Sequence, residues 1–197
     1  QESIRVWHAP GPVREVNVNN CGRHDIAKLL RSRFFTSLQP DIVHIPSLFE
    51  GYVDDAVTSV GGFDKKTLVS VTVHDLIPLL NPAQYLAPSP GYKKYYLHQV
   101  DSLKEVNIFL AVSESSRREL IDGLGFDGDS IINASGGVDS DFGVIAGGDA
   151  FSSLRVKFGL NLPFVLYTGG TDERKNLPRL IEAWSFLPSV LRQQHQL

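Results

Sequence analysis

The sequence contains no methionine and only one cysteine, Cys21. A single cysteine cannot form a disulfide within the chain or build a zinc site from several thiolates, and it is typical of a reducing compartment. The chain begins at Gln1 rather than at methionine. We therefore expect it to be a processed chain or an internal part of a longer protein.

Long hydrophobic runs are also missing. The longest, such as 108–112 and 162–167, fall far short of the roughly 20 apolar residues that cross a bilayer. No targeting segment is visible either. We expect a cytoplasmic protein without a transmembrane segment, an arrangement compatible with peripheral association at the inner face of the membrane.

Cationic residues are not in excess, since 19 Lys and Arg stand against 22 Asp and Glu, for a net charge of −3. Nucleic acid is therefore not an expected partner, because its capture needs a surplus of positive charge on one face. A hydrophobic share of 42% with 21% charged residues is typical of a folded globular protein with one large domain or two small ones.

Short apolar runs alternate with helical patterns along most of the chain. Four runs resemble buried parallel strands: 41–45, 67–73, 108–112 and 130–133. Helical spacing occupies 23–38, about 91–106, and the segment after a capping-box pair at Ser116 and Glu119. This order predicts a Rossmann-like, doubly wound parallel α/β sheet, in which ligands bind at the carboxyl ends of the strands.

The first of these helices is predicted to be amphipathic. Its apolar residues recur at helical spacing, with most of the arginines on the other side: Ile26, Leu29, Leu30, Phe34 and Leu38.

Composition changes after residue 142. The segment 143–150 is rich in glycine and is predicted to be a linker between a first domain, 1–142, and the beginning of a second, 151–197. In the second we expect a short helix around 151–158, a new buried strand at 163–167, and a helix from Leu177 onward.

The strongest local motif is the turn after that last strand, which carries Gly169 and Gly170, followed by Arg174 and Lys175 at the start of a helix. Glycines allow close approach to the backbone, a helix start offers free N–H groups, and two cations add positive charge. These features suit a diphosphate. A tight turn with two solvated cations is the equally weighted alternative.

His74 and Asp75 end the second run, at the position where a parallel sheet presents its ligand-binding residues. A histidine there can bind a substrate oxygen or take part in acid–base chemistry, with the carboxylate beside it. Hydrogen bonding to backbone carbonyls is the competing explanation. His44, Ser113 and Glu114 are weaker candidates, with packing as the alternative for His44 and helix capping for Ser113.

Five segments in this order resemble the family 4 glycosyltransferases, the retaining enzymes of the GT-B fold. They are 40–44, 71–78, 111–116, 137–139 and 167–177. The resemblance implies two Rossmann-like domains facing a cleft, with the acceptor bound mainly by the first and a nucleoside diphosphate sugar mainly by the second.

Several roles follow from the resemblance. His74 matches the histidine that lines the cleft near the transferred sugar and is the expected catalytic residue. Gly169, Gly170, Arg174 and Lys175 match the donor diphosphate site, where the cations would stabilise the leaving group without a metal. His44, Asp75, Ser113 and Glu114 are candidates for the acceptor side. No cofactor is expected, and the expected partners are a nucleotide-sugar and a glycan or glycolipid acceptor.

The chain departs from the family pattern in three ways. Gly170 stands where many members have arginine, the first strand and glycine-rich loop of the acceptor domain are not found, and the carboxylate pair that holds the donor sugar is absent. We therefore expect the chain by itself to be inactive. A hexosyltransferase of polysaccharide, O-antigen or glycolipid biosynthesis is the leading hypothesis; a GT-B sugar-nucleotide epimerase and a non-catalytic nucleotide- or phosphate-binding module are the alternatives.

Overall fold

The computed structural model describes residues 4–64, 66–143 and 149–197. They belong to two compact units, Gln1–Gly137 and Val138–Leu197. Residues 144–148, most of the predicted glycine-rich linker, lie outside the described residues.

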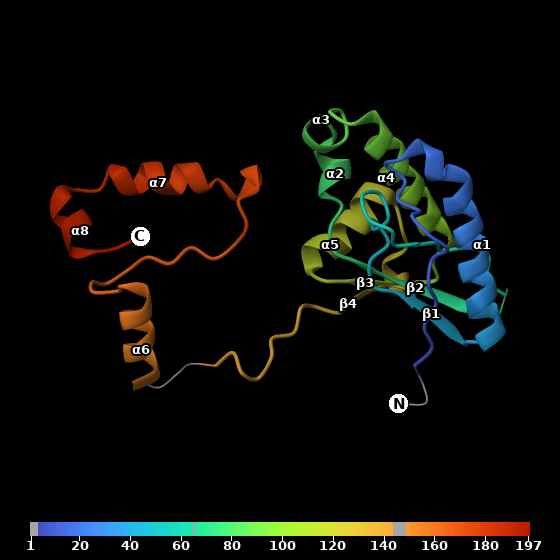
Figure 1. The fold of residues 1–197 in the computed structure, drawn as a ribbon, viewed down its shortest axis with the longest axis horizontal. Coiled ribbons are helices and arrows are strands. Elements are labelled where there is room, and N and C mark those ends of the chain that lie inside the picture. Colours follow the sequence, from blue (N-terminus) through green and yellow to red (C-terminus); the bar gives the residue numbers. More distant parts are fainter. Residues whose placement is uncertain (1–3, 65, 144–148) are drawn as a thin grey trace. The chain divides into compact units, whose positions relative to one another are not determined.

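The first unit is built on a four-stranded sheet (Figure 1). Its strands are β1 (Ile42–Ile45), β2 (Leu68–Val73), β3 (Ile108–Ala111) and β4 (Ile131–Asn133). All neighbouring strands are parallel, and their order in the sheet is their order in the chain. The predicted α/β class, with its parallel sheet, is confirmed.

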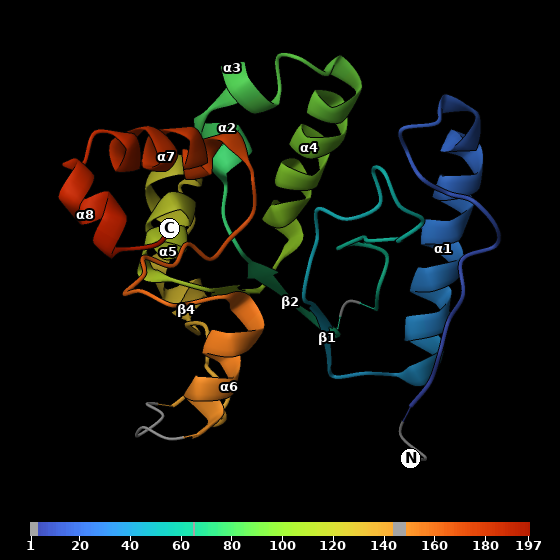
Figure 2. The ribbon, with the colours of Figure 1, turned by 60° about the vertical axis from the view of Figure 1, so that its left-hand side comes forward.

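Helices precede and connect the strands of the first unit (Figures 1 and 2). They are α1 (Cys21–Leu38), α2 (Ile77–Leu80), α3 (Pro82–Tyr85), α4 (Pro90–Ser102) and α5 (Glu114–Arg118). Ser89 caps α4 by accepting a hydrogen bond from the Tyr92 N–H, and Pro90 occupies a first-turn position, where its missing N–H is harmless.

The core lies on one face of the sheet. In β2 three valines alternate with Ser70 and Thr72, and the valines are buried: Val69, Val71 and Val73. Since side chains alternate between the faces of a strand, this pattern directs one face inward. The valines pack with Phe109 and with Leu120, which follows α5. At about 25 cal/mol per Å² of apolar surface, such burial is the main stabilising contribution in this unit.

The opposite face of the sheet, called here the open face, is only partly covered within the described residues. Ile42 is 53% exposed, Leu68 44% and Ile132 54%. The apolar runs were expected to be buried, and this expectation is wrong for that face. These side chains are exposed because the hydrophobic core forms on the other face of the sheet, the face that bears Val69, Val71 and Val73.

Helix α1 also differs from the prediction. Its apolar residues Ile26, Leu29 and Leu30 are 55%, 68% and 47% exposed, whereas His24 and Ser32 are buried. Polar contacts select this side of the helix: the His24 Nδ1 lies 2.8 Å from the Val13 carbonyl oxygen, and the Arg31 guanidinium donates to the Ser59 carbonyl at 3.1 Å. The apolar residues of the predicted amphipathic helix are therefore largely exposed within the described residues.

The start of α5 corrects a second local prediction. Ser113, not Ser116, is the N-cap, and its side chain accepts a hydrogen bond from the Ser116 N–H at 3.1 Å. Glu119 does not complete a capping box, because its carboxylate accepts from the Leu76 N–H at 2.8 Å. The helix starts almost as soon as β3 ends, which moves the cap toward the strand.

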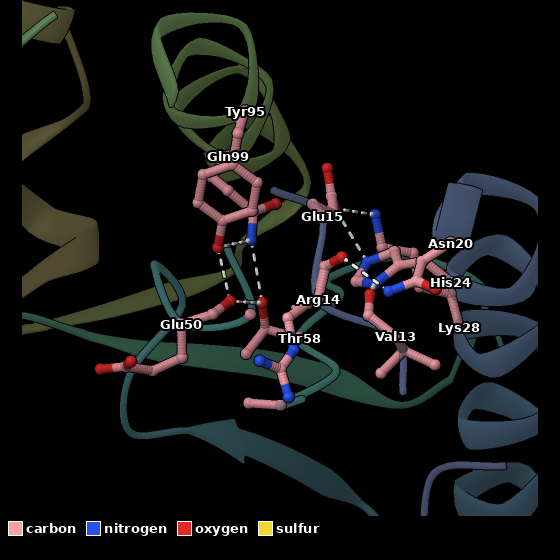
Figure 3. A network of polar contacts seen from close by, with 12 residues as sticks. Val13, Arg14, Glu15, Asn20, His24, Lys28, Glu50, Thr58, Tyr95 and Gln99 are labelled. Carbon is pink, nitrogen blue, oxygen red and sulfur yellow. Dashed lines mark hydrogen bonds and ion pairs between the residues drawn. The ribbon is translucent and has the colours of Figure 1, made fainter. Parts of the chain in front are cut away.

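A polar network holds the loop after β1 against α4 (Figure 3). The buried Gln99 amide nitrogen lies 2.7 Å from the Leu48 carbonyl oxygen and 2.9 Å from the Thr58 hydroxyl. The Tyr95 hydroxyl donates to the Glu50 carbonyl. Buried polar groups need such partners, so α4 fixes the course of residues 48–58.

A second cluster joins the N-terminal segment to α1 (Figure 3). The Glu15 carboxylate lies 2.8 Å from His24 Nε2 and 3.5 Å from Lys28 Nζ. Burial by itself raises the pKa of Glu15, but the hydrogen bond to His24 and the charge of Lys28 outweigh it and lower this pKa.

The second unit contains α6 (Asp149–Phe158), α7 (Leu177–Ser185) and α8 (Ser189–Gln194). The strand predicted at 163–167 is not formed: Phe164 makes a single parallel bridge with Gln196, and Leu166 is 72% exposed. A strand needs a continuous partner to satisfy its backbone, and the described residues supply only this one bridge. The prediction of a buried strand is therefore wrong here.

We predict that Gln99→Leu destabilises the protein by about 1–3 kcal/mol, because the buried Leu48 carbonyl loses a donor while the side-chain volume is nearly kept. Urea unfolding measures the change. Gln84→Leu, the same substitution at an exposed position of α3, is the matched control. Equal stabilities of the two variants would contradict the role of the Gln99 network.

A lowered pKa means that ionised Glu15 stabilises the folded protein above its ordinary pKa of 4.5, and that this contribution is lost as the pH falls through the lowered folded value. The difference in Tm between the wild type and Glu15→Gln should thus be steady near neutral pH and shrink in acid. Glu105→Gln, at an exposed carboxylate, controls for the loss of one charge. A difference that does not shrink at any acidic pH at which the protein remains folded would refute the prediction.

Candidate functional site

His74 and Asp75 stand at the carboxyl end of β2, one of the two central strands. They line a hollow of about 300 Å³ together with residues of the loop after β1 and of α4, among them Ser47, Glu50 and Tyr92. The structure therefore brings two of the predicted site residues, His74 and Asp75, into one depression at the ligand-binding edge of a parallel sheet.

The backbone of this pair is held from α5 and the turn after it. The Ser116 hydroxyl donates to the His74 carbonyl at 2.6 Å. The Glu119 carboxylate accepts a hydrogen bond from the backbone N–H of Leu76, two residues further along the chain. The Asp75 carboxylate accepts from the Ile77 N–H at 3.1 Å. These contacts fix the turn that follows β2, so the His74 side chain projects from a rigid base.

The His74 imidazole is exposed. Its Nε2 lies 3.3 Å from the Pro46 carbonyl oxygen, which can only accept a hydrogen bond, so Nε2 is the donor. Nδ1 has no hydrogen-bond partner in the described part of the chain. The ring is thereby oriented by one nitrogen and presents the other to a ligand.

Negative charge gathers around this hollow. Burial raises the pKa of Tyr92, and the charges of Asp75 and Glu50 raise it further. Tyr92 thus stays protonated and can donate a hydrogen bond. Carboxylates beside a phenol and an imidazole can bind the hydroxyl groups of a polar, uncharged ligand.

The Tyr96 hydroxyl lines the same hollow from a side chain that is only 2% exposed. No well-aligned hydrogen bond satisfies this oxygen in the described residues, although the Leu79 backbone lies near it. The ring stacks on Phe49, with centroids 4.8 Å apart.

His44 does not join this hollow. It projects from β1 on the open face of the sheet, where Nδ1 lies 2.8 Å from the Ser70 hydroxyl and Nε2 3.2 Å from the Thr72 hydroxyl. Both ring nitrogens therefore have partners on the neighbouring strand. This geometry corresponds to the hydrogen-bonded alternative that the sequence left open for His44.

Ser113 and Glu114 are also engaged elsewhere. Ser113 caps α5, as its alternative interpretation anticipated. The Glu114 carboxylate lies 3.5 Å from the Arg117 guanidinium and 3.6 Å from that of Arg118. Its Oε2 also accepts from the Asn133 amide at 3.4 Å, which ties the start of α5 to the end of β4.

The second unit carries the glycine turn and its cations. Gly169 has φ +149°, in a region that L side chains rarely adopt, and a Cβ there would lie 3.0 Å from the Tyr167 hydroxyl. That hydroxyl donates to the Gly170 carbonyl at 2.7 Å. Glycine is therefore required at 169 by the turn itself.

The Asp172 carboxylate caps the short 3₁₀ turn Glu173–Lys175 by accepting from the Arg174 N–H at 3.0 Å, and it pairs with the Arg174 guanidinium at 3.4 Å. Lys175 is exposed, and its ammonium has no ion-pair partner among the residues described. Of the two cations, Lys175 is the one free to meet an incoming anion.

Residues described by the structure include no group of three or more His, Cys, Asp or Glu side chains arranged to hold a metal ion. None of the described helices combines the length and apolar character needed to cross a membrane.

Sequence reasoning missed Glu50 and Tyr92 as site residues. Glu50 lies in an irregular loop without a motif, and Tyr92 belongs to a tyrosine cluster that predicts packing. Tyr95 and Tyr96 are indeed buried, whereas Tyr92 is half-buried and faces two hollows. Tyr92 lies in the first turn of α4, near the carboxyl ends of the strands, and this position could have identified it as a site residue.

Comparison with known proteins gives one kind of match. Three curated proteins of Escherichia coli, each named serotype-specific mannosyltransferase WbdA, are 31%, 30% and 30% identical to the chain over all 197 residues. No family model and no solved structure matches the chain. The chain spans about a quarter of the length of these relatives, 24%, 24% and 23%. It is similar along its whole length to one part of these mannosyltransferases.

Proposed function

We propose that the chain is part of a glycosyltransferase that moves mannose from a nucleoside diphosphate mannose to a glycan acceptor in polysaccharide biosynthesis. The observation that carries the proposal is the similarity to proteins named mannosyltransferases over all 197 residues. The matched length spans the residues of the hollow at His74 and of the glycine turn at Gly169.

The proposed reaction joins an acceptor hydroxyl oxygen to the anomeric carbon of mannose and breaks the bond from that carbon to the diphosphate. The diphosphate leaves with the bonding electron pair, and the proton of the acceptor hydroxyl passes to an oxygen of this leaving group. In line with the resemblance to family 4 enzymes of the GT-B fold, we propose that the configuration at the anomeric carbon is retained.

His74 and Asp75 would act on the sugar side of this reaction. The free Nδ1 of His74 can accept a hydrogen bond from a sugar hydroxyl, and the neighbouring carboxylate can bind a second hydroxyl. Such contacts place the reacting sugar, and positioning of this kind is a large part of enzymatic rate acceleration.

The glycine turn would act on the diphosphate. Gly169 and Gly170 leave the backbone accessible, and Lys175 and Arg174 would stabilise the negative charge that develops on the leaving group. The pairing of Arg174 with Asp172 reduces the charge that it can offer, so Lys175 has the larger proposed role. No metal is needed in this scheme.

Transfer is favoured over the two alternatives by the names of the relatives, which are all transferases. An epimerase or a silent binding module has no comparable support. We further propose cytoplasmic action, where nucleotide-sugars are the donors, with the acceptor glycan or glycolipid at the inner face of the membrane.

For the donor site, Lys175→Ala in the full-length protein that carries these residues should weaken nucleotide-sugar binding at least tenfold, because a charge-assisted contact contributes roughly 1.5–3 kcal/mol. Calorimetry with GDP-mannose and UDP-mannose measures the change. Lys157→Ala, at an exposed lysine of α6, is the matched control. Equal donor affinities in both variants would exclude the diphosphate role of Lys175.

For the sugar side, His74→Ala should lower kcat at least tenfold, with a smaller effect on donor affinity, because the lost contact acts on the reacting sugar. Initial rates of mannose transfer give kcat and KM separately. His8→Ala, at an exposed histidine of the N-terminal segment, is the control. Wild-type turnover by His74→Ala would remove this residue from the mechanism.

A further inference from the structure

Two more hollows lie beside the one at His74. The second, about 420 Å³, shares Phe49, Glu50 and Tyr92 with it. The third, about 500 Å³, shares Tyr52 with the second and extends between α1 and the N-terminal half of α4. Neighbouring hollows share these lining residues, so they lie next to one another in a row from His74 to Lys94. This row of adjoining hollows is called here the extended groove.

The walls of the extended groove are rigid. The Tyr52 ring packs between two α4 tyrosines, with centroids 5.2 Å from Tyr92 and 5.4 Å from Tyr95. Gly91 makes this packing possible, since a Cβ there would lie 2.9 Å from the Tyr52 hydroxyl. The loop that bears Glu50 and Tyr52 is held in turn by the buried Gln99 amide (Figure 3). A preformed groove binds a ligand at a lower cost in ordering.

The chemistry of the extended groove fits a neutral, polyhydroxylated chain. Aromatic rings offer apolar faces next to polar edges, and both signs of charge occur along the row. A polyanion would meet the carboxylates of Glu50, Asp54 and Asp25. A saccharide, in contrast, uses carboxylates as acceptors for its hydroxyls and ammonium or imidazole groups as donors.

The far end of the groove has unengaged polar side chains. Asp25 on α1 and Lys94 and His98 on α4 line the third hollow and are exposed. None of the three has a hydrogen-bond or ion-pair partner within the described residues. Lys94 and His98 are four residues apart in one helix and therefore point to the same side.

We propose that the extended groove binds several consecutive sugars of the acceptor glycan, with the reacting end at His74 and the preceding sugars running past Tyr92 and Tyr52 to Lys94. This inference rests on the proposed function and specifies in addition that the acceptor is a chain of several sugars. The enzyme thereby prefers a growing chain to a single sugar, because each further unit occupies a further hollow.

The test compares acceptors of different length in the full-length protein. With GDP-mannose as donor, kcat/KM is measured for a mannose disaccharide and a mannose octasaccharide. The wild type should prefer the octasaccharide at least tenfold, and Lys94→Ala should reduce this preference about fivefold. Lys93→Ala, at the adjacent exposed lysine that lines none of the three hollows, should keep it.

Equal kcat/KM for both acceptors in the wild type, or the same loss of preference in both lysine variants, would overturn the extended groove while leaving mannose transfer intact. Calorimetry with the octasaccharide alone provides a readout independent of turnover. Binding that Lys94→Ala weakens and Lys93→Ala leaves unaltered supports the groove. Absence of transfer to any acceptor, in contrast, counts against the proposed function.

Discussion

The fold of the first unit depends on the one-sided burial of β2. Its valines enter the core and its serine and threonine do not, which fixes the face of the sheet that helices and loops can cover. The same strand pairs with β1 and β3, so it has no free edge. The turn after β2 therefore inherits a well-defined position, and that turn bears His74 and Asp75.

Everything at the carboxyl edge is arranged around this turn. The residues after β3 bind it through Ser116 and Glu119, and α4 holds the loop after β1 through Gln99. Two irregular segments thus become parts of one rigid edge without forming regular structure themselves. Such loops on a fixed scaffold are where binding residues usually gather, and the row of hollows from His74 to Lys94 is formed in this way.

In the second unit the local turn structure is formed, whereas the strand predicted before it is not. The glycine turn, the Asp172 cap and the left-handed Asn176 before α7 are all present, since each is specified by residues close in sequence. The strand before the turn is reduced to one bridge at Phe164, because a strand depends on partners that the described residues do not supply. Turn chemistry is thus more local than strand formation.

The sequence by itself determined the α/β class, the four strands of the sheet and the placement of His74 at a ligand edge, because periodicity and the residues that end a strand are local signals. Only the tertiary structure decided which side of α1 is buried, because His24, Ala27 and Ser32 are buried and the His24 and Arg31 side chains contact backbone carbonyls on that side. It also decided that His44 and Glu114 are paired elsewhere and that Glu50, Tyr52 and Lys94 line adjoining hollows. These residues are distant in the chain, and only packing between a loop and two helices brings them together.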